Sequence, residues 1–391
     1  MTQLNWSCNL PWRGFSNDPD GRVRPCCIYR DVIKQDNGEP FYIQTHSVKE
    51  IFSSDYMKNL RNEFRSGEKP TGCEVCIKDE QNGAKSKRQV YSVPLGEQVD
   101  FNQEPDYPIE YQMIISNACN LKCRSCTPSH SSSWQAEHKI IWGNTGYQMP
   151  HGQPSDQTSV LWQNRSDWMQ HVQRLEVVGG EPFYISKWQM LWNELIERGL
   201  SKNIYLDMST NATINASKII RLLAANFKNV GIGLSIDGIG STYNYLRHPA
   251  QWNDVRKILI AYHSIPNVAF SYSHTIGWVN AWELPEFHTW ARTFTFKFYI
   301  WNNIIHRPRH MSIIMMPIEA KDLIEEKWKR FDWGIYKQDV QGIINFMRSE
   351  QPSDNEIRLE YKKFLAHDSI RNESIKNIIP VELKILEKYF E

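Results

Sequence analysis

The run Ser116-Asn-Ala-Cys119-Asn-Leu-Lys-Cys123-Arg-Ser-Cys126 places three cysteines within eight residues. It follows a β-rich run at 110–116, and five more such runs alternate with helical patterns along the chain. We expect these further strands at 174–178, 204–209, 230–236, 268–275 and 295–301, and helices near 131–141, 186–198, 216–227, 252–264 and 284–293. The alternation predicts an α/β fold, a partial (β/α)6 TIM-like barrel with parallel strands and ligands at the carboxyl ends of the strands.

Three regions differ in character along the sequence. We predict a small Cys-rich domain at 1–100, the partial barrel at 101–310 and a C-terminal helical extension at 311–391. Within the first region, Ser47 followed by Glu50 is a capping-box pattern that predicts one helix continuing to Phe64. The segment 143–170 is predicted to be a long insertion between the first barrel helix and the second strand.

The composition is that of a folded, nearly neutral protein. Of 391 residues, 41% are hydrophobic, and 45 Lys and Arg nearly balance 44 Asp and Glu, so we expect no partnership with nucleic acid or an anionic membrane. The first residues lack a basic stretch followed by an apolar run, and no run of 18 apolar residues occurs. A cytoplasmic location is therefore expected.

The eight cysteines are clustered, at positions 8, 26, 27, 73, 76, 119, 123 and 126. In a reducing compartment such clustering favours metal ligation over disulfides. Three thiolates on one short loop can hold three irons of a four-iron cube and leave the fourth iron without a protein ligand. Zinc is the alternative, because closely spaced thiolates bind it as well.

The three-cysteine loop, followed one strand later by Val178-Gly179-Gly180-Glu181-Pro182, resembles the radical S-adenosylmethionine (SAM) superfamily. The resemblance implies a [4Fe-4S] cluster on Cys119, Cys123 and Cys126 whose open iron is chelated by SAM. It also implies reductive cleavage of SAM to a 5′-deoxyadenosyl radical, which removes a hydrogen atom from a substrate carbon. The sequence departs from the family at Ser125, where an aromatic residue near the adenine is common.

The same resemblance assigns the SAM contacts to the ends of the strands. Gly179, Gly180 and Glu181 would accept hydrogen bonds from the methionyl amino group. The other implied contacts are Ser209, Asn211, Ser235, Asp237, Arg247 as the partner of the SAM carboxylate, and Asn280 near the adenine or methionyl group. The alternatives are an ordinary strand-to-helix turn for the two glycines and a solvated arginine at a helix end for Arg247.

The N-terminal cysteines form a second motif. Cys8 is followed after twelve residues by Gly21 and after four more by Cys26, and Cys73 and Cys76 complete a set that resembles SPASM and twitch auxiliary-cluster domains. The resemblance implies a second [4Fe-4S] cluster on these four thiols. Cys27 is left as a spare thiol, an alternative ligand or a buried residue, and structural zinc is the alternative metal. In the family this module usually follows the barrel, whereas here it precedes it.

The substrate is less well defined by the sequence. Resemblance to SPASM and twitch enzymes implies a peptide or protein side chain first, and then a sugar or small metabolite, with flavodoxin or ferredoxin as electron donor. His274, Tyr299, Trp301 and His306 lie near predicted strand ends and are candidates for the pocket lining. The rival hypothesis from another class is a zinc-stapled, non-enzymatic binding protein.

Overall fold

The computed structural model describes residues 6–81, 86–91, 99–143, 147–293 and 299–390. The chain divides into two compact units. The first unit comprises Met1–Ala118, Tyr147–Met208 and Leu222–Gly231, and the second comprises Cys119–Gly146, Ser209–Arg221 and Ile232–Glu391. The predicted division into three domains at residues 100 and 310 stays a prediction.

Eight strands form a mixed, mainly parallel sheet. They are β1 (Gly14–Asn17), β2 (Val23–Arg24), β3 (Glu110–Met113), β4 (Arg174–Val177), β5 (Tyr205–Thr210), β6 (Asn229–Ser235), β7 (Ala269–Ile276) and β8 (Tyr299–Ile304). Their order is β2-β1-β3-β4-β5-β6-β7-β8. β1 pairs with β2 antiparallel, whereas the pairs β1–β3, β3–β4, β4–β5 and β7–β8 are parallel. The sheet is open, with β2 and β8 at its ends, and the predicted α/β class is confirmed.

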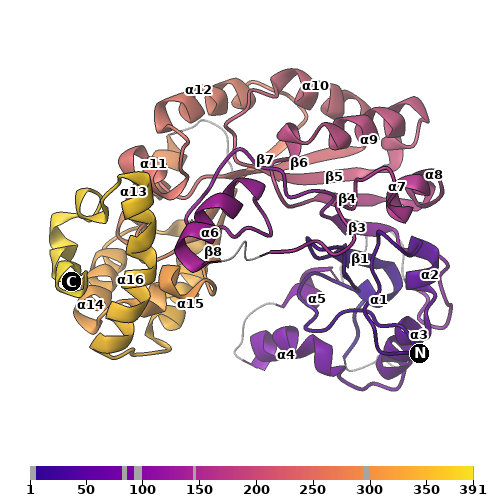
Figure 1. The fold of residues 1–391 in the computed structure, drawn as a ribbon, viewed down its shortest axis with the longest axis horizontal. Coiled ribbons are helices and arrows are strands. Elements are labelled where there is room, and N and C mark those ends of the chain that lie inside the picture. The colour runs from indigo at the N-terminus through magenta and orange to yellow at the C-terminus, as the bar shows by residue number, and fades with distance from the viewer. Residues whose placement is uncertain (1–5, 82–85, 92–98, 144–146, 294–298, 391) are drawn as a thin grey trace. The chain divides into compact units, whose positions relative to one another are not determined.

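Helices occupy most of the segments between the strands. They are α1 (Leu10–Arg13), α2 (Val48–Phe52), α3 (Asp55–Arg65), α4 (Glu74–Gln81), α5 (Lys87–Tyr91), α6 (Gln135–Trp142), α7 (Val160–Gln163), α8 (Arg165–Trp168), α9 (Ser186–Glu197), α10 (Ser217–Asn226), α11 (Gly240–Leu246), α12 (Trp252–His263), α13 (Leu284–Arg292), α14 (Ile318–Lys329), α15 (Lys337–Arg348) and α16 (Asp354–Arg371). In Figure 1, α14, α15 and α16 gather near the C-terminus.

The helices form where apolar residues recur at helical spacing. In α9, Trp188, Leu191, Trp192 and Leu195 are all buried and lie three or four residues apart, so they share one face. The strands alternate with a period of two instead. In β7, Phe270, Tyr272, His274 and Ile276 are buried, while the serines and threonine between them are less so.

Three parts of the local prediction differ from the structure. The helix expected from Ser47 to Phe64 begins as predicted, since the Ser47 hydroxyl accepts a hydrogen bond from the Glu50 N–H, but it breaks into α2 and α3. Ser54 caps the second piece by accepting from the Met57 N–H, which explains the break. The short strands β1 and β2 were not predicted, and the segment 143–170 contains α7 and α8. The predicted strand at 295–301 falls partly outside the described residues.

None of the described helices combines the length and the apolar character needed to cross a membrane.

Candidate functional site

The three-cysteine loop lies in the second unit and is held by hydrogen bonds to its own carbonyl groups. The Ser133 hydroxyl donates to the Cys119 carbonyl oxygen at 2.6 Å, and the Trp134 indole N–H donates to that of Cys123 at 2.8 Å. The Cys126 N–H closes a turn onto the same Cys123 oxygen at 2.9 Å. Two side chains that directly precede α6 therefore fix the course of the loop by hydrogen bonds to its backbone.

The three thiols of the loop are half-buried and close enough to influence one another. Burial raises the pKa of Cys123 to about 11, with the charges of Asp237 and Cys119 adding to the rise and Arg247 opposing it. Burial also raises the pKa of Cys126, and the charges of Cys123 and Cys119 raise it further. Binding of a metal cluster by Cys123 and Cys126 would therefore displace their protons.

An ion pair and an amide lie beside these thiols. Arg247 Nη2 is 2.8 Å from Asp237 Oδ2, and Arg247 Nη1 is 3.9 Å from Cys123 Sγ. Burial lowers the pKa of Arg247, but the charges of Asp237 and Cys123 outweigh it and raise that pKa. Asn211 Nδ2 lies 3.9 Å from Cys119 Sγ and donates to Asn120 Oδ1 at 2.9 Å. Polar groups from the ends of two strands therefore approach the loop sulfurs.

Asp237 and Asn280 are engaged within the protein. Asp237 Oδ1 accepts from the Thr275 N–H at 2.9 Å, so both of its carboxylate oxygens have partners. The Asn280 amide donates to the carbonyl oxygens of Asp237 and Thr275, and its oxygen accepts from the Gly277 N–H. Asn280 thus braces the turn after β7.

Two further predicted contacts differ in their exposure. Ser209 is exposed near the end of β5, and Ser235 is half-buried at the end of β6. Both lie at strand positions whose neighbours in the sequence, Met208, Thr210, Leu234 and Ile236, are buried. Alternation therefore turns these two hydroxyls to the less covered face of their strands.

The Gly-Gly-Glu-Pro segment lies in the first unit, directly after β4. Gly179 and Gly180 have φ angles of 78° and 57°. A Cβ atom on Gly180 would lie 2.4 Å from the Ala118 carbonyl oxygen, so this close approach of two backbones requires glycine. The Glu181 N–H donates to the same oxygen at 2.9 Å, and the buried Glu181 carboxylate accepts from the Phe183 N–H at 3.2 Å. The segment is thereby tied to the residue that precedes Cys119.

Four N-terminal cysteines line one pocket in the first unit: Cys8, Cys26, Cys73 and Cys76. Burial raises the pKa of Cys8 to about 12, and the charges of Cys26 and Cys76 add to the rise. Burial likewise raises the pKa of Cys73, with contributions from the other three thiols. Residues up to 68 positions apart therefore place four sulfur donors around a common space.

The fifth N-terminal cysteine lies outside that pocket. Cys27 is exposed and accepts a hydrogen bond from Lys87 Nζ at 2.8 Å. Lys87 and Arg88, both on α5, line the pocket of the other four thiols. Arg88 pairs with Glu80 at 2.6 Å and donates to the Ser7 carbonyl oxygen. The cationic side chains of Lys87 and Arg88 thus lie beside the four thiols, which would be negatively charged as metal ligands.

The donor sets suit iron–sulfur clusters in number and type. One pocket offers four thiols, a complete set for a [4Fe-4S] cluster, and the loop offers three, which would leave one iron open. Within the ranges that the structure describes, no three His, Cys, Asp or Glu side chains are gathered around a point that would hold a single metal ion. The assignment therefore rests on the shared pocket and on the mutual influence of the thiols.

The candidate substrate residues divide between the two faces of β7 and β8. Tyr299 and Trp301 are 41% and 54% exposed, with their rings 4.5 Å apart, and they pair in register with Ser271 and Ser273. His274 faces the other way. It is buried against Phe287 of α13, its Nδ1 lies 2.7 Å from the Ile236 carbonyl oxygen, and burial lowers its pKa to about 4. His306 is exposed and lies against Phe346.

Sequence reasoning missed the side chains that hold the loop from outside. Arg124 lies inside the quoted motif, but its partners Asp368 and Glu373 lie more than 240 residues further along the chain. Nothing in the local pattern marks those carboxylates. Trp134 and Ser133 were missed as well, although their position soon after the last cysteine was a usable signal.

Comparison with known proteins identifies the N-terminal region. Residues 8–77 match the SPASM family, described as an iron-sulfur cluster-binding domain. This match contains Cys8, Cys26, Cys73 and Cys76, and it confirms the prediction of a SPASM-like domain at the N-terminus. No curated protein matches the sequence at a significant level.

Solved structures also resemble the chain. One is anSMEcpe with bound AdoMet and a Cp18Cys peptide, at 17% identity and a TM-score of 0.36, covering 61% of this chain and 65% of that one. Another is Streptococcus suis SuiB bound to the precursor peptide SuiA, at 14% identity and a TM-score of 0.36, covering 66% of this chain and 58% of that one. The present chain thus spans just under two thirds of the length of anSMEcpe.

Proposed function

We propose that this protein is a radical SAM enzyme with an N-terminal auxiliary iron–sulfur cluster. The observation that carries the proposal is the convergence of three half-buried thiols, Cys119, Cys123 and Cys126, on one loop after β3. When bound there, a [4Fe-4S] cluster with SAM supplies one-electron cleavage of SAM and hydrogen-atom abstraction from a substrate carbon. The protein supplies orientation and exclusion of water.

The residues around the loop would orient SAM. Arg247 is buried beside Cys123 and carries a fixed positive charge, which suits a carboxylate. Its ion pair with Asp237 would hold the guanidinium in place before SAM arrives. Asn211 offers a polar atom beside Cys119. We assign Gly179, Gly180 and Glu181 to SAM binding on the family resemblance alone. We assign Ser209, Ser235 and Asn280 to the same site on the family resemblance alone.

The auxiliary site would serve the substrate radical. Four thiols saturate a cluster, so this centre would act as an electron acceptor and not as a second SAM site. Lys87 and Arg88 would balance the charge of its thiolates.

The substrate we propose is a peptide or protein side chain, as the resemblance to SPASM enzymes implies. Tyr299 and Trp301 support this choice, because exposed aromatic rings beside the hydroxyls of β7 suit a chain with both apolar and amide groups. Peptides from the proteins encoded beside this gene, analysed by mass spectrometry after reaction, would identify the modified residue. A sugar or small metabolite as the sole modified compound would contradict the peptide assignment.

The first experiment measures metal and SAM cleavage together. Protein purified without oxygen is analysed for iron and sulfide, and then incubated with SAM and a strong reductant while 5′-deoxyadenosine is quantified. The proposal expects about eight irons per chain, from two four-iron clusters, and formation of 5′-deoxyadenosine. Zinc in place of iron, with intact SAM, would favour the zinc-stapled binding protein instead.

A pair of variants then separates the two sites. Cys73→Ala with Cys76→Ala is expected to remove about half of the iron and to leave SAM cleavage by the other cluster. Cys123→Ala is expected to abolish SAM cleavage while the N-terminal cluster remains. Loss of all iron in both variants would show that the two groups of thiols do not hold independent clusters.

A further inference from the structure

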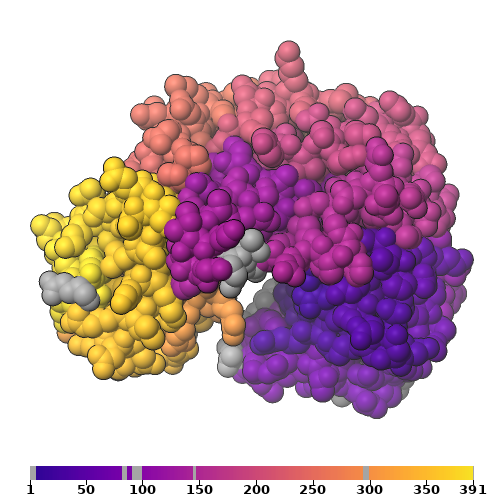
Figure 2. All heavy atoms as spheres, viewed as in Figure 1, coloured from indigo at the N-terminus to yellow at the C-terminus, as the bar shows by residue number. Residues whose placement is uncertain are grey.

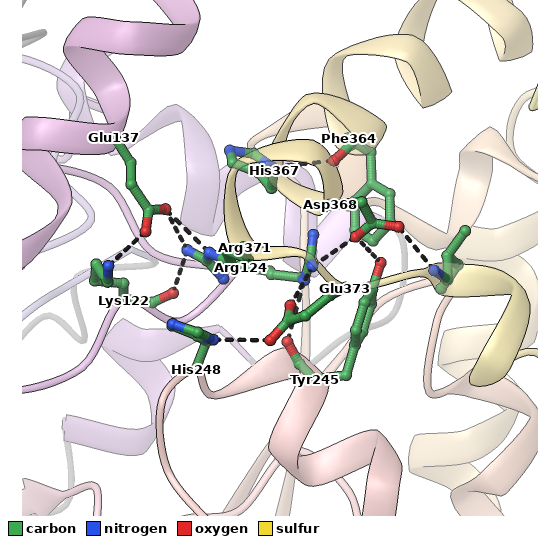
Figure 3. A network of polar contacts seen from close by, with 11 residues as sticks. Lys122, Arg124, Glu137, Tyr245, His248, Phe364, His367, Asp368, Arg371 and Glu373 are labelled. Atoms are coloured by element: carbon green, nitrogen blue, oxygen red, sulfur yellow. Dashed lines mark hydrogen bonds and ion pairs between the residues drawn. The ribbon is translucent and has the colours of Figure 1, made fainter.

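The residues between the loop cysteines are held by the C-terminal segment of the chain. Figure 3 shows Lys122 and Arg124 of the loop facing Asp368, Arg371 and Glu373 at and beyond the end of α16. All of these residues belong to the second unit. In Figure 2 the yellow C-terminal segment lies directly against the magenta surface of the part of the chain that contains α6.

Arg124 is the centre of this contact. Its side chain is 0% exposed, and its Nη2 is 2.6 Å from both Asp368 Oδ1 and Glu373 Oε2. Its Nε donates to the Tyr245 carbonyl oxygen at 3.1 Å, and its guanidinium lies 3.8 Å from the centre of the Tyr245 ring. The Arg124 N–H also donates to the Leu246 carbonyl oxygen at 2.8 Å. Backbone and side chain of this residue are therefore both fixed.

The two carboxylates are themselves held in position. Asp368 Oδ1 also accepts from the Tyr245 hydroxyl at 2.7 Å, and its Oδ2 accepts from the Ile375 N–H at 2.7 Å. Glu373 Oε1 lies 2.8 Å from His248 Nδ1. Hydrogen bonds to His248 and Arg124 lower the pKa of Glu373 against the opposing effect of burial. Both carboxylates are thus fixed in position beside the loop.

A second set of ion pairs holds the other side of Cys123. Lys122 Nζ is 2.5 Å from Glu137 Oε1, and Arg371 Nη2 is 2.8 Å from Glu137 Oε2. Arg371 also donates to the Lys122 carbonyl oxygen at 2.7 Å, and the Lys122 N–H donates to the His248 carbonyl oxygen. The residues on both sides of Cys123 are therefore fixed by charged partners.

Stability alone does not account for buried charges of this kind. Desolvation offsets most of the attraction in a buried ion pair, and apolar residues of similar volume often stabilise a fold as well or better. What charged pairs add is a defined geometry and a local field. Both matter most next to a redox centre, because nearby charge helps to set the reduction potential of an iron–sulfur cluster.

We propose that Asp368 and Glu373, acting through Arg124, are positioning residues that fix the three-cysteine loop and set the charge beside its cluster. Arg371 and Glu137 fix the loop in the same way at Lys122. The segment from Asp368 to Glu373 then contributes to the geometry and the electrostatics of the SAM-cleaving centre. This inference rests on the proposed function, in that it assumes a cluster on Cys119, Cys123 and Cys126.

The test uses the full chain with Cys73→Ala and Cys76→Ala, so that only the loop cluster contributes to the signal. Asp368→Asn is introduced into this background, and the reduction potential is measured by titration monitored with electron paramagnetic resonance. Removing one negative charge beside the cluster makes reduction easier, so the potential is expected to shift to a more positive value. The spectrum of the reduced cluster is expected to change as well.

A matched control separates this effect from general loss of an ion pair in the C-terminal region. Glu325 pairs with Arg348 at 2.6 Å, with no contact to the loop, so Glu325→Gln removes a comparable charge elsewhere. The control is expected to keep the parent potential and spectrum. If Asp368→Asn fails to fold, Glu373→Gln replaces it, because that side chain is 23% exposed and its loss is milder.

Amide hydrogen exchange of the cluster-free protein provides the second measurement. The Lys122 and Arg124 amides are expected to exchange about tenfold faster or more in Asp368→Asn than in Glu325→Gln. An unchanged potential and spectrum together with unchanged exchange would overturn the inference. A background protein that binds no iron refutes the proposed loop cluster instead, and the exchange measurement still decides whether the C-terminal segment fixes the loop.

Discussion

Replacing Gly180 with alanine is expected to destabilise the turn after β4 more than the same replacement at Gly179. The φ angle of Gly180 is 57°, a left-handed conformation that costs a residue with a Cβ atom about 1–2 kcal/mol. The new Cβ would also lie 2.4 Å from the Ala118 carbonyl oxygen and 3.1 Å from that of Ser116. Both obstacles are backbone atoms, so relief requires movement of the chain next to Cys119.

The size of the effect follows from these two terms. Overpacking of a tight site costs about 1–3 kcal/mol, so the total with the backbone term is about 2–5 kcal/mol. Gly179→Ala is the matched control. Its φ angle is 78°, but its nearest obstacle is the Ile114 Cγ2 methyl group at 2.6 Å, which is a side-chain atom and not a backbone atom. We expect a smaller loss for this variant, because a side chain moves more easily than a backbone carbonyl group.

The assay compares thermal unfolding of the two variants with the parent, together with SAM binding measured by calorimetry on the iron-loaded protein. Gly180→Ala should have the lower melting temperature and the weaker SAM affinity. Equal melting temperatures for the parent and Gly180→Ala would refute the reasoning, as would a larger loss for Gly179→Ala.

Three other predictions concern single side chains. Burial lowers the pKa of His288 to about 4, against about 6.5 in the unfolded chain, so the free energy of unfolding falls as the pH drops from 6.5 toward 4. Between pH 7.5 and 5 the parent should lose about 2 kcal/mol more of this free energy than His288→Gln, as measured by chemical denaturation. Equal losses in the two proteins would contradict this. Cys27→Ser should retain all the iron of the parent, because Cys27 lies outside the four-thiol pocket, and a loss of iron would make it a ligand. Trp134→Phe removes the hydrogen-bond donor to the Cys123 carbonyl oxygen and should lower the melting temperature through a loss of about 1 kcal/mol. Amide exchange in the loop should become faster. Unchanged exchange would argue against a role of Trp134 in holding the loop.

Local patterns predicted much of the fold. The strands β4 to β7 and the helices α9, α10, α12 and α13 lie within one residue of their expected ends, and β3 begins at the expected residue but ends three residues earlier. Apolar residues at spacings of two or of three and four residues report which face is buried, and this information is contained in a short window of sequence. The same reasoning missed β1, which is buried at all four residues and shows no alternation, and β2, which has only two residues.

Residue types and their spacing were enough to identify the two groups of cysteines, the turn with two glycines and the SPASM-like character of residues 8–77. The separation of Cys27 from the other four thiols and the packing of His274 against α13 are visible only in the folded chain. The folded chain also shows that Asp368, 244 residues after Arg124, supplies the partner of that buried charge. Such pairings depend on how the whole chain closes on itself, and no local period or motif records which distant carboxylate will meet a given guanidinium.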